Sequence, residues 1–185
     1  METLLRRIYE EGIDYDETYA SVARLENIRL LLAFAFIIKF KLYQIDVKSD
    51  FLNGFIKEDV YVEQSLGFED CKFHNYIYKL KKSLYGLKQA PKSWYERLSM
   101  FLLENYFQRR KMDSTLFIKR VGDHILLIQV YVDDIIFVSI YNSLCKGFAS
   151  IMQGEFEMSI IGELTFFLGL QIKQMEGGTF ISQSK

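Results

Sequence analysis

Three aspartates occupy positions at which carboxylates can hold a metal ion. Asp133 and Asp134 are adjacent and separate two largely apolar runs, 125–132 and 135–138, and Asp46 lies in a separate alternation of apolar and polar residues. Neighbouring carboxylates in a poorly solvated setting raise each other's proton affinity unless a cation is present. Magnesium prefers oxygen ligands and usually takes one or two protein carboxylates, which leaves positions for water and a substrate phosphate. The three acids therefore predict a magnesium site.

Nucleotidyl transfer is the chemistry that such a site would serve. One metal ion would activate a primer 3′-hydroxyl, and a second ion ~3.5–4 Å away would stabilise the triphosphate and its pyrophosphate leaving group. From these residues alone, an equally good interpretation is that Asp133 and Asp134 form a polar hairpin turn and that Asp46 is a solvated strand residue. A metal-dependent nuclease is a weaker interpretation, because the sequence offers no obvious histidine or lysine base beside the acids.

The predicted strands place each acid on or beside a sheet. A strand over 42–47 that buries its apolar residues turns Asp46 to the opposite face, because side chains alternate along a strand. The runs 125–132 and 135–138 predict a hairpin that carries the other two aspartates at its turn.

Helices and further hairpins are predicted around these strands. In a helix at 27–39, Leu and Phe cover so much of the circumference that it should be deeply buried. The sole proline, Pro91, precedes a helical pattern at 92–105, as expected for a first helical turn. The apolar face of a third helix, at 142–156, comprises Leu144, Phe148, Ile151 and Met152. The remaining predicted turns and strands are 50–54, 60–62, 77–80, 114–120, 166–174 and 179–183, with hairpin loops at 121–123 and at Gly177–Gly178. This order indicates an α+β fold built from antiparallel hairpins and supporting helices.

The composition fits one compact globular unit. The chain has 185 residues, of which 50% are hydrophobic and 16% aromatic, so it can bury a substantial core. Its longest apolar run, 30–38, is far shorter than the ~20 residues of a bilayer span. Residues 1–11 lack the apolar stretch of a secretory signal, and two cysteines are too few for a secreted disulfide scaffold. We therefore expect a soluble, intracellular protein without membrane contact.

A basic and aromatic segment at 72–97 is a local patch that could bind a polyanion, although the net charge of the chain is only −1. The segment contains only one acid, Glu96, against seven cations: Lys72, Lys79, Lys81, Lys82, Lys88, Lys92 and Arg97. The interleaved aromatic residues are Tyr76, Tyr78, Tyr85, Trp94 and Tyr95. Such a mixture can track phosphates and stack on bases. On composition alone, a solvated lysine-rich surface over an aromatic core is the preferred interpretation.

Six longer motifs follow one another along the chain: Gly12–Thr18, Val22–Arg24, Gln44–Gly54, Leu84–Pro91, Tyr131–Asp134 and Phe167–Leu170. Together they resemble the reverse transcriptases of copia-type retrotransposons, over a match that runs from about Glu11 to Lys185. Several long motifs in collinear order are far more specific than an Asp–Asp pair. The resemblance implies an RNA-directed DNA polymerase with the right-hand fold.

The resemblance also implies roles for individual residues. Asp46 and Asp133 would be the principal ligands of two Mg²⁺ ions, with Asp134 completing the acidic cluster and with Mn²⁺ as a substitute metal. Phe51 would admit or reject the 2′-hydroxyl of the incoming sugar, although core packing explains this aromatic residue equally well. The predicted nucleotide-binding residues are Lys48, Phe51, Gln89 and Arg24, and the predicted primer grip is Phe167, Leu168, Gly169 and Leu170.

The implied architecture is a fingers subdomain and a palm subdomain without a thumb. The fingers would comprise 1–21 and 54–93, and the palm, with an antiparallel sheet and supporting helices, would comprise 22–53 and 94–185. The implied partners are an RNA template, a DNA primer and deoxynucleoside triphosphates. The chain would be a fragment of a Pol polyprotein that also contains integrase and ribonuclease H.

Two departures from the family pattern favour a different hypothesis. Ser21 stands where the family usually has proline, and Asp50 stands where it usually has a small residue, so an extra acid would lie beside the triphosphate. The basic strand expected before Gly12 is also short. The alternative is thus a degenerate, catalytically inactive retroelement fragment with at most weak nucleic-acid binding. Lys146 is a weak candidate for a general acid, because a solvated helix lysine explains it better.

Overall fold

The computed structural model describes residues 25–38, 40–175 and 178–183. The chain divides into two compact units, of which the first contains Phe51–Arg97 and the second contains Ser21–Asp50 and Leu98–Lys185. The predicted site residue Arg24, the departure at Ser21 and the two most N-terminal motifs lie outside the described residues. The names fingers and palm stay predictions for these units.

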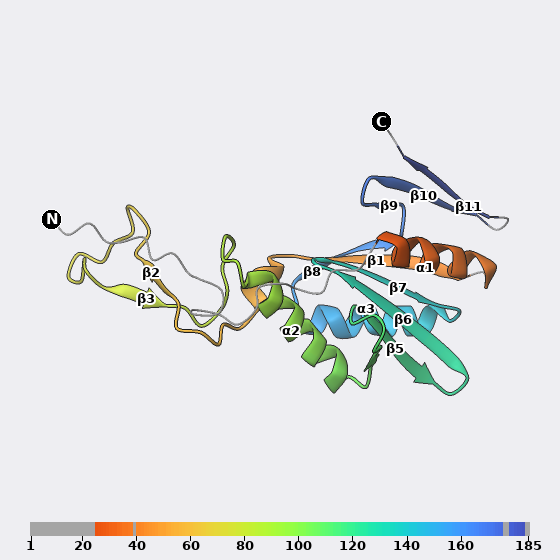
Figure 1. Cartoon of the computed structure of the whole chain (residues 1–185), viewed down its shortest axis with the longest axis horizontal. Coiled ribbons are helices and arrows are strands. Elements are labelled where there is room, and N and C mark those ends of the chain that lie inside the picture. The colour runs from red at the N-terminus through yellow and green to blue at the C-terminus, as the bar shows by residue number, and fades with distance from the viewer. Residues whose placement is uncertain (1–24, 39, 176–177, 184–185) are drawn as a thin grey trace. The chain divides into compact units, whose positions relative to one another are not determined.

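A six-stranded antiparallel sheet forms the centre of the second unit (Figure 1), in the order β4-β5-β6-β7-β1-β8. Its strands are β1 Lys41–Val47, β4 Gln108–Arg109, β5 Leu116–Val121, β6 His124–Tyr131, β7 Asp134–Ser139 and β8 Met158–Glu163. The predicted hairpins β5–β6 and β6–β7 are confirmed. Strand β1 comes first in the sequence but lies between β7 and β8, so the strand that carries Asp46 occupies the interior of the sheet.

Two helices cover opposite faces of this sheet. Helix α1 (Leu25–Ile37) packs on β1, and helix α3 (Asn142–Glu155) packs on β7 and β8 (Figure 1). Ile136 and Val138 on β7 join the core beneath α1, whereas the ring of Phe137 lies 5.0 Å from the ring of Phe148 on α3. Because side chains alternate along β7, this strand contributes residues both to the core beneath α1 and to the packing against α3. Within the described ranges, every helix is too short or too polar to span a bilayer.

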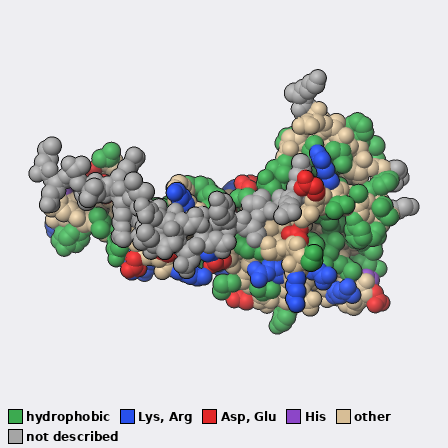
Figure 2. Space-filling model, in the orientation of Figure 1, with side chains coloured by type: hydrophobic (Ala, Val, Ile, Leu, Met, Phe, Trp, Pro, Cys, Tyr) green, Lys and Arg blue, Asp and Glu red, His purple; other side chains and the backbone are tan. Residues whose placement is uncertain are grey.

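The prediction that the first helix is deeply buried on all sides is wrong. One stripe of α1 is buried, formed by Ile28, Leu31, Leu32 and Ala35. Leu30 and Ile37 are 68% and 75% exposed, because a helix that lies on one layer buries only the stripe that faces this layer. Figure 2 shows the hydrophobic side chains that gather over this part of the second unit. The buried face of α3 is also rotated from the prediction: Ile151 is exposed, and the buried residues are Cys145, Phe148, Ala149 and Met152.

A separate three-stranded sheet ends the second unit, in the order β11-β10-β9. Its strands are β9 Phe166–Phe167, β10 Leu170–Met175 and β11 Gly178–Gln183. The single strand predicted at 166–174 is wrong, because the chain reverses at Leu168 and Gly169, which have φ of 48° and 79°. Positive φ at both central residues of a two-residue hairpin loop is the pattern of a type I′ turn. Glycine makes this turn possible at one position only, so Leu168 bears the conformational cost at the other.

The side chain of Gln174 joins this small sheet to strand β1. Its Oε1 accepts a hydrogen bond from the Leu42 N–H (2.9 Å), and its Nε2 donates to the carbonyls of Leu42 (3.0 Å) and Leu164 (3.1 Å). Strand β8 ends at Glu163, and Leu164 still donates its N–H to the Leu42 carbonyl (2.8 Å), so the glutamine gives the Leu42 N–H the acceptor that a further strand residue would supply. One side-chain amide thus fixes the β9–β11 sheet against the strand of Asp46.

The first unit contains a short hairpin of β2 (Tyr61–Glu63) and β3 (Ile77–Lys79), which confirms the predicted pairing. The 3-10 helix η1 (Asp50–Asn53) lies at its boundary, as the predicted turn at 50–54 requires. Helix α2 (Ala90–Glu104) begins before the predicted Lys92 and contains Pro91 in its first turn. Gly54 is needed here because a Cβ would lie 2.7 Å from backbone atoms of Ser93 and Trp94.

Candidate active site

The structure brings Asp46, Asp133 and Asp134 together on neighbouring strands. Asp46 on β1 is the cross-strand partner of Asp134, the first residue of β7. Asp133 occupies the adjoining β6–β7 turn, where its carbonyl accepts a hydrogen bond from the Val47 N–H (3.1 Å). Cross-strand partners share one face of a sheet, so Asp46 and Asp134 lie side by side. Asp46 therefore forms one local group with two adjacent acids that are far from it in the sequence.

The turn that carries Asp133 has an unusual backbone. Val132 has φ of 49°, and Tyr131 and Asp134 pair on either side of the two-residue loop. A β-branched residue with positive φ is a genuine outlier, and such strain persists only where the surrounding structure over-determines it. Pairing of β7 with both β6 and β1 supplies that constraint. The chain at the acids is thus held in a conformation that valine disfavours.

Burial and mutual repulsion make two of the acids hold their protons more tightly. Burial raises the pKa of Asp46, the charge of Asp133 raises it further, and Lys48 opposes the change. Burial also raises the pKa of Asp134, against a hydrogen bond donated by the Gln44 side chain, and the charges of Asp133 and Asp46 add to the increase. The ionised acids repel one another in this arrangement.

The donor set fits a divalent cation by its chemistry. Carboxylate oxygens are hard ligands, and a bound Mg²⁺ would remove the repulsion that raises the two pKa values. Within the described part of the chain, however, the side chains as they stand place no three Asp, Glu, His or Cys groups in position to hold a metal ion. Metal binding at Asp46, Asp133 and Asp134 therefore stays a prediction.

Lys48 lies next to the acids but also has an acidic partner. Its Nζ is 3.4 Å from the Glu157 carboxylate, both side chains are exposed, and its N–H donates to the Glu157 carbonyl (2.9 Å). An exposed pair of this kind contributes little to stability and exchanges readily with solvent or an anion. The role of Lys48 in nucleotide binding stays a prediction.

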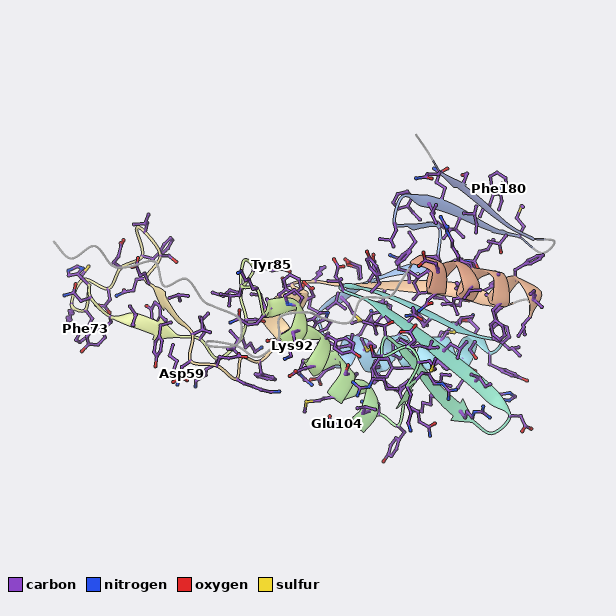
Figure 3. The ribbon with its side chains drawn as sticks, viewed as in Figure 1. Asp59, Phe73, Tyr85, Lys92, Glu104 and Phe180 are labelled. Carbon is purple, nitrogen blue, oxygen red and sulfur yellow. The ribbon has the colours of Figure 1, made fainter. Side chains whose placement is uncertain are left out.

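Two predicted nucleotide-binding residues belong to the first unit. The ring of Phe51 is half-buried and lies 5.0 Å from the ring of Tyr85, which Figure 3 shows on the loop before α2. Gln89 is only 4% exposed, and its backbone carbonyl accepts the Ser93 N–H at the start of α2. Their contacts do not distinguish a nucleotide-binding role from core packing.

The basic and aromatic segment divides into a core and a surface within the first unit. Trp94 and Tyr95 are buried, whereas the tyrosines that precede them are exposed: Tyr76, Tyr78 and Tyr85. Lys82 and Arg97 both lie over the ring of Phe55, at 5.8 Å from its centroid. The interpretation of this segment as a solvated lysine-rich surface over an aromatic core is therefore correct for Trp94 and Tyr95. It is wrong for the three exposed tyrosines.

Sequence reasoning missed a half-buried acid that anchors α1. Asp113 accepts hydrogen bonds from Asn27 (2.7 Å) on α1, from Thr115 and from Gln129 on β6. Burial raises its pKa, but the hydrogen bonds outweigh burial and hold the pKa below the ordinary value. The signal was Asp113-Ser114-Thr115 before a strand, since short polar side chains there cap backbone N–H groups.

The residues predicted as the primer grip form the β9–β10 turn. Phe167 and Leu170 pair across the turn and are buried, and Leu168 and Gly169 are its exposed tip. The Phe167 ring meets the ring of Tyr131, the residue before the acid turn, edge to face at 5.5 Å. The two turns are therefore linked through one aromatic pair.

Comparison with known proteins defines the class of this chain. A sequence profile described as "Reverse transcriptase (RNA-dependent DNA polymerase)" matches residues 7–185, and the chain belongs to this family. The particular branch follows from its relatives, which are Pol polyproteins of copia- and Ty1-type retrotransposons.

Three relatives illustrate the extent of the similarity. The chain is 37% identical over 174 residues to the "Retrovirus-related Pol polyprotein from transposon RE1" of Arabidopsis thaliana. The aligned region covers 94% of this chain and 12% of the relative. It is 33% identical over 164 residues to the polyprotein of transposon TNT 1-94 of Nicotiana tabacum (88% and 12%). It is 30% identical over 143 residues to the Gag-Pol polyprotein of transposon Ty1-DR5 of Saccharomyces cerevisiae (72% and 8%). The chain thus spans about an eighth or less of these relatives, and no solved structure matches it significantly.

Proposed function

We propose that this chain is the catalytic core of an RNA-directed DNA polymerase that adds deoxynucleotides to a primer 3′-hydroxyl. The observation that carries the proposal is the cross-strand pair of Asp46 and Asp134 with Asp133 in the adjoining turn. Repulsion among these acids favours a divalent cation, which the polymerase reaction requires. The family membership of the chain supports the same reaction.

In this proposal the three carboxylates hold two Mg²⁺ ions, or Mn²⁺ in their place. The ions would supply an activated 3′-hydroxyl and charge stabilisation for the leaving pyrophosphate. Gln44 fixes the rotamer of Asp134 through its hydrogen bond, and the strained turn fixes the position of Asp133. Lys48 would add positive charge for the triphosphate beside Asp46.

The proposed roles of the other predicted residues follow the family pattern. Phe51, Gln89 and Arg24 would contact the incoming nucleotide, and the β9–β10 turn would grip the primer. The first unit would act as fingers and the second as palm. An RNA template, a DNA primer and the rest of a Pol polyprotein, with integrase and ribonuclease H, would be the partners.

Primer extension tests the proposal with a matched pair of substitutions. We expect Asp133→Asn to reduce Mg²⁺-dependent deoxynucleotide incorporation on an RNA template roughly a hundredfold or more. Asp123→Asn is the control, because Asp123 is also an exposed acid in a hairpin loop, between β5 and β6. Equal incorporation by the two variants would contradict the catalytic role of Asp133.

A second readout separates metal binding from catalysis. Mg²⁺ that binds only the folded chain should raise its unfolding free energy, by about 2.7 kcal/mol at a hundred times Kd. We expect this increase with the Asp123→Asn control and not with Asp133→Asn. Stabilisation without incorporation would place the defect outside the metal site.

A degenerate, catalytically inactive retroelement fragment with at most weak nucleic-acid binding is the second candidate. The observation in its favour is that, among the described residues, no group of three Asp, Glu, His or Cys side chains is placed to hold a metal ion. This candidate predicts neither incorporation nor Mg²⁺-dependent stabilisation, in the chain or in the control.

A further inference from the structure

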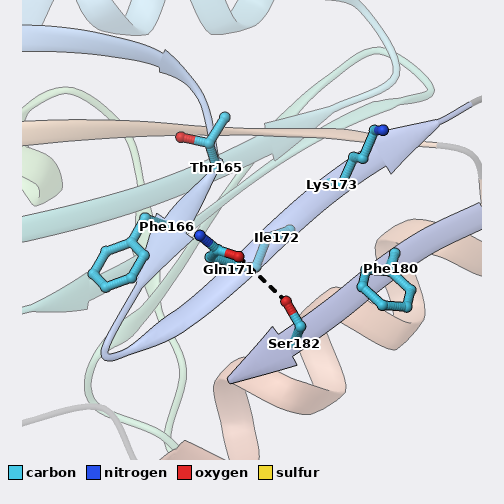
Figure 4. Close-up of a pocket in the computed structure, with 7 residues that line it drawn as sticks. All are labelled: Thr165, Phe166, Gln171, Ile172, Lys173, Phe180 and Ser182. Carbon is cyan, nitrogen blue, oxygen red and sulfur yellow. Dashed lines mark hydrogen bonds between the residues drawn. The ribbon is translucent and has the colours of Figure 1, made fainter. Parts of the chain in front are cut away.

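The outward face of the β9–β11 sheet displays a set of side chains that the polymerase chemistry does not use. Gln171 on β10 is the cross-strand partner of both Phe166 and Ser182, and Lys173 is the partner of Phe180. Cross-strand partners and every second residue of a strand point to one face, so these five side chains share a surface. Figure 4 shows them around an open depression of about 460 Å³.

The two aromatic rings on this face are left in water. Phe166 is 53% exposed and Phe180 is 60% exposed, whereas the opposite face of the same strands buries Phe167, Leu170 and Ile172. The sheet therefore completes its core without either exposed ring. From the strand spacing, the two rings lie roughly 12 Å apart, two strands across and two residues along.

The polar groups between the rings fit a polyanion with flat apolar parts. Lys173 is exposed and is the one charged residue among those that line the depression, which include no carboxylate: Thr165, Phe166, Gln171, Ile172, Lys173, Phe180 and Ser182. The Ser182 hydroxyl lies 3.4 Å from the Gln171 side-chain oxygen, so the amide N–H₂ of Gln171 is directed elsewhere. Rings that stack, a cation and amide donors together match the base, the phosphate and the sugar edge of a nucleotide.

We propose that the outward face of the β9–β11 sheet binds single-stranded nucleic acid, with bases stacked on Phe166 and Phe180 and a phosphate at Lys173. A docking protein would need a larger continuous apolar area, and the amides, hydroxyls and lysine that separate the rings oppose this. Aromatic residues on an exposed sheet are a general means to stack splayed bases without sequence preference. Binding on this face needs neither a divalent cation nor the three carboxylates, so it extends the proposed polymerase function without depending on it.

The test is fluorescence anisotropy with a labelled twelve-nucleotide oligo-uridine or oligo-thymidine in EDTA. We expect Phe166→Leu and Phe180→Leu each to weaken binding roughly tenfold, since leucine keeps the apolar bulk and loses the stacking face. Phe180→Tyr should bind as the parent chain does. Tyr106→Leu is the control, because Tyr106 is 83% exposed and lies in the same unit beside β4. Lys173→Gln should make the plot of log K against log salt shallower by about 0.7.

A cross-linking measurement fixes the location. Oligonucleotides that carry 5-iodouridine should cross-link, on illumination, to peptides that contain Phe166 or Phe180. The proposal is overturned if the Phe180→Leu and Tyr106→Leu variants bind alike, or if the cross-links map to other peptides. Asp133→Asn should bind as the parent chain does, so loss of polymerase activity and loss of this surface are separate results.

Discussion

Two turns of the second unit share a loop length and a positive φ at the first loop residue, and differ in what holds them. The acid turn (Tyr131–Asp134) and the apolar turn (Phe167–Leu170) are both two-residue hairpin loops, and each begins with a positive φ at a bulky residue, 49° at Val132 and 48° at Leu168. The apolar turn has both flanking side chains buried, whereas the acid turn is flanked by half-buried Tyr131 and Asp134. The second loop residue differs, because Gly169 also has a positive φ (79°) and Asp133 does not, so two related turns give an anchored hairpin in one place and an open, charged one in the other. Packing stabilises the first, and the second keeps repulsion that a ligand can relieve.

The largest expected effect tests the anchor of the apolar turn. Phe167 is 1% exposed and meets Tyr131 edge to face, so Phe167→Ala should reduce the unfolding free energy by about 3–5 kcal/mol. Urea denaturation measures this change. The neighbouring Phe166→Ala is the matched control, and it should cost less than about 1 kcal/mol because Phe166 is mostly exposed. Similar losses in both variants would remove the distinction between the two turns.

A smaller effect concerns the glycine of the apolar turn. Gly169 has φ of 79°, and a Cβ there would meet no atom within 4 Å, so Gly169→Ala should cost about 1–2 kcal/mol through backbone strain alone. Gly147→Ala in α3 also meets no atom and has no positive φ, so it should instead add about 0.5–1 kcal/mol. Opposite signs in thermal or chemical denaturation would support the turn geometry, and equal signs would contradict it.

Relief of strain in the acid turn should be smaller still. Asparagine tolerates positive φ, so Val132→Asn should raise the unfolding free energy by roughly 0.5–1 kcal/mol after the loss of half-buried apolar surface. Val121→Asn, at the exposed end of β5, lacks a positive φ and should not stabilise the chain. We also expect Val132→Asn to reduce primer extension, because Asp133 would lose its fixed position. A stability loss in Val132→Asn would show that this valine is not strained.

The smallest effect is a difference in pH dependence between the acid turn and Asp113. The pKa of Asp134 is raised on folding, so the folded chain takes up a proton first, and stability should increase as the pH falls from 7 toward the ordinary value of about 3.9. The pKa of Asp113 is lowered, so its contribution should be lost as the pH falls below about 3.9. Urea denaturation from pH 7 to 3 should show a flatter rise for Asp134→Asn and a weaker acid loss for Asp113→Asn. The reverse assignment would contradict the burial and hydrogen bonds of these groups.

Strands and hairpins were predictable where turn residues and apolar runs coincide. Val121-Gly122-Asp123 and Asp133-Asp134 break long β-rich runs, and both hairpins occur as predicted. The β9–β10 turn was not predictable from local pattern, because Leu168 is a poor turn residue and only the family motif marked a hairpin there. Local preference was overridden by the burial of Phe167 and Leu170 on either side.

The acids were predictable as a group, and of the polar contacts around them only that of Gln44 could have been predicted. Alternation along β1 placed Asp46 on one face, and the same alternation places Gln44 beside Asp134, a contact that strand periodicity alone could have indicated. Asp113 and Gln174 depend on residues that are 86 and 132 positions away in the sequence, and no local pattern encodes such contacts. The exposed side of α1 was mispredicted because composition shows how apolar a helix is and not how many of its sides are covered.

The hydrogen bonds between Gln174 and Leu42 have a consequence for the order in which the sheet can form during synthesis. The two residues are 132 positions apart, which a ribosome covers in roughly 7–26 s at 5–20 residues per second. Throughout that interval the nascent strand β1, which carries Asp46, lacks its final partners, first β7, then β8 and last the glutamine side chain. A strand that is made early is therefore completed only when residues more than a hundred positions further along have been made.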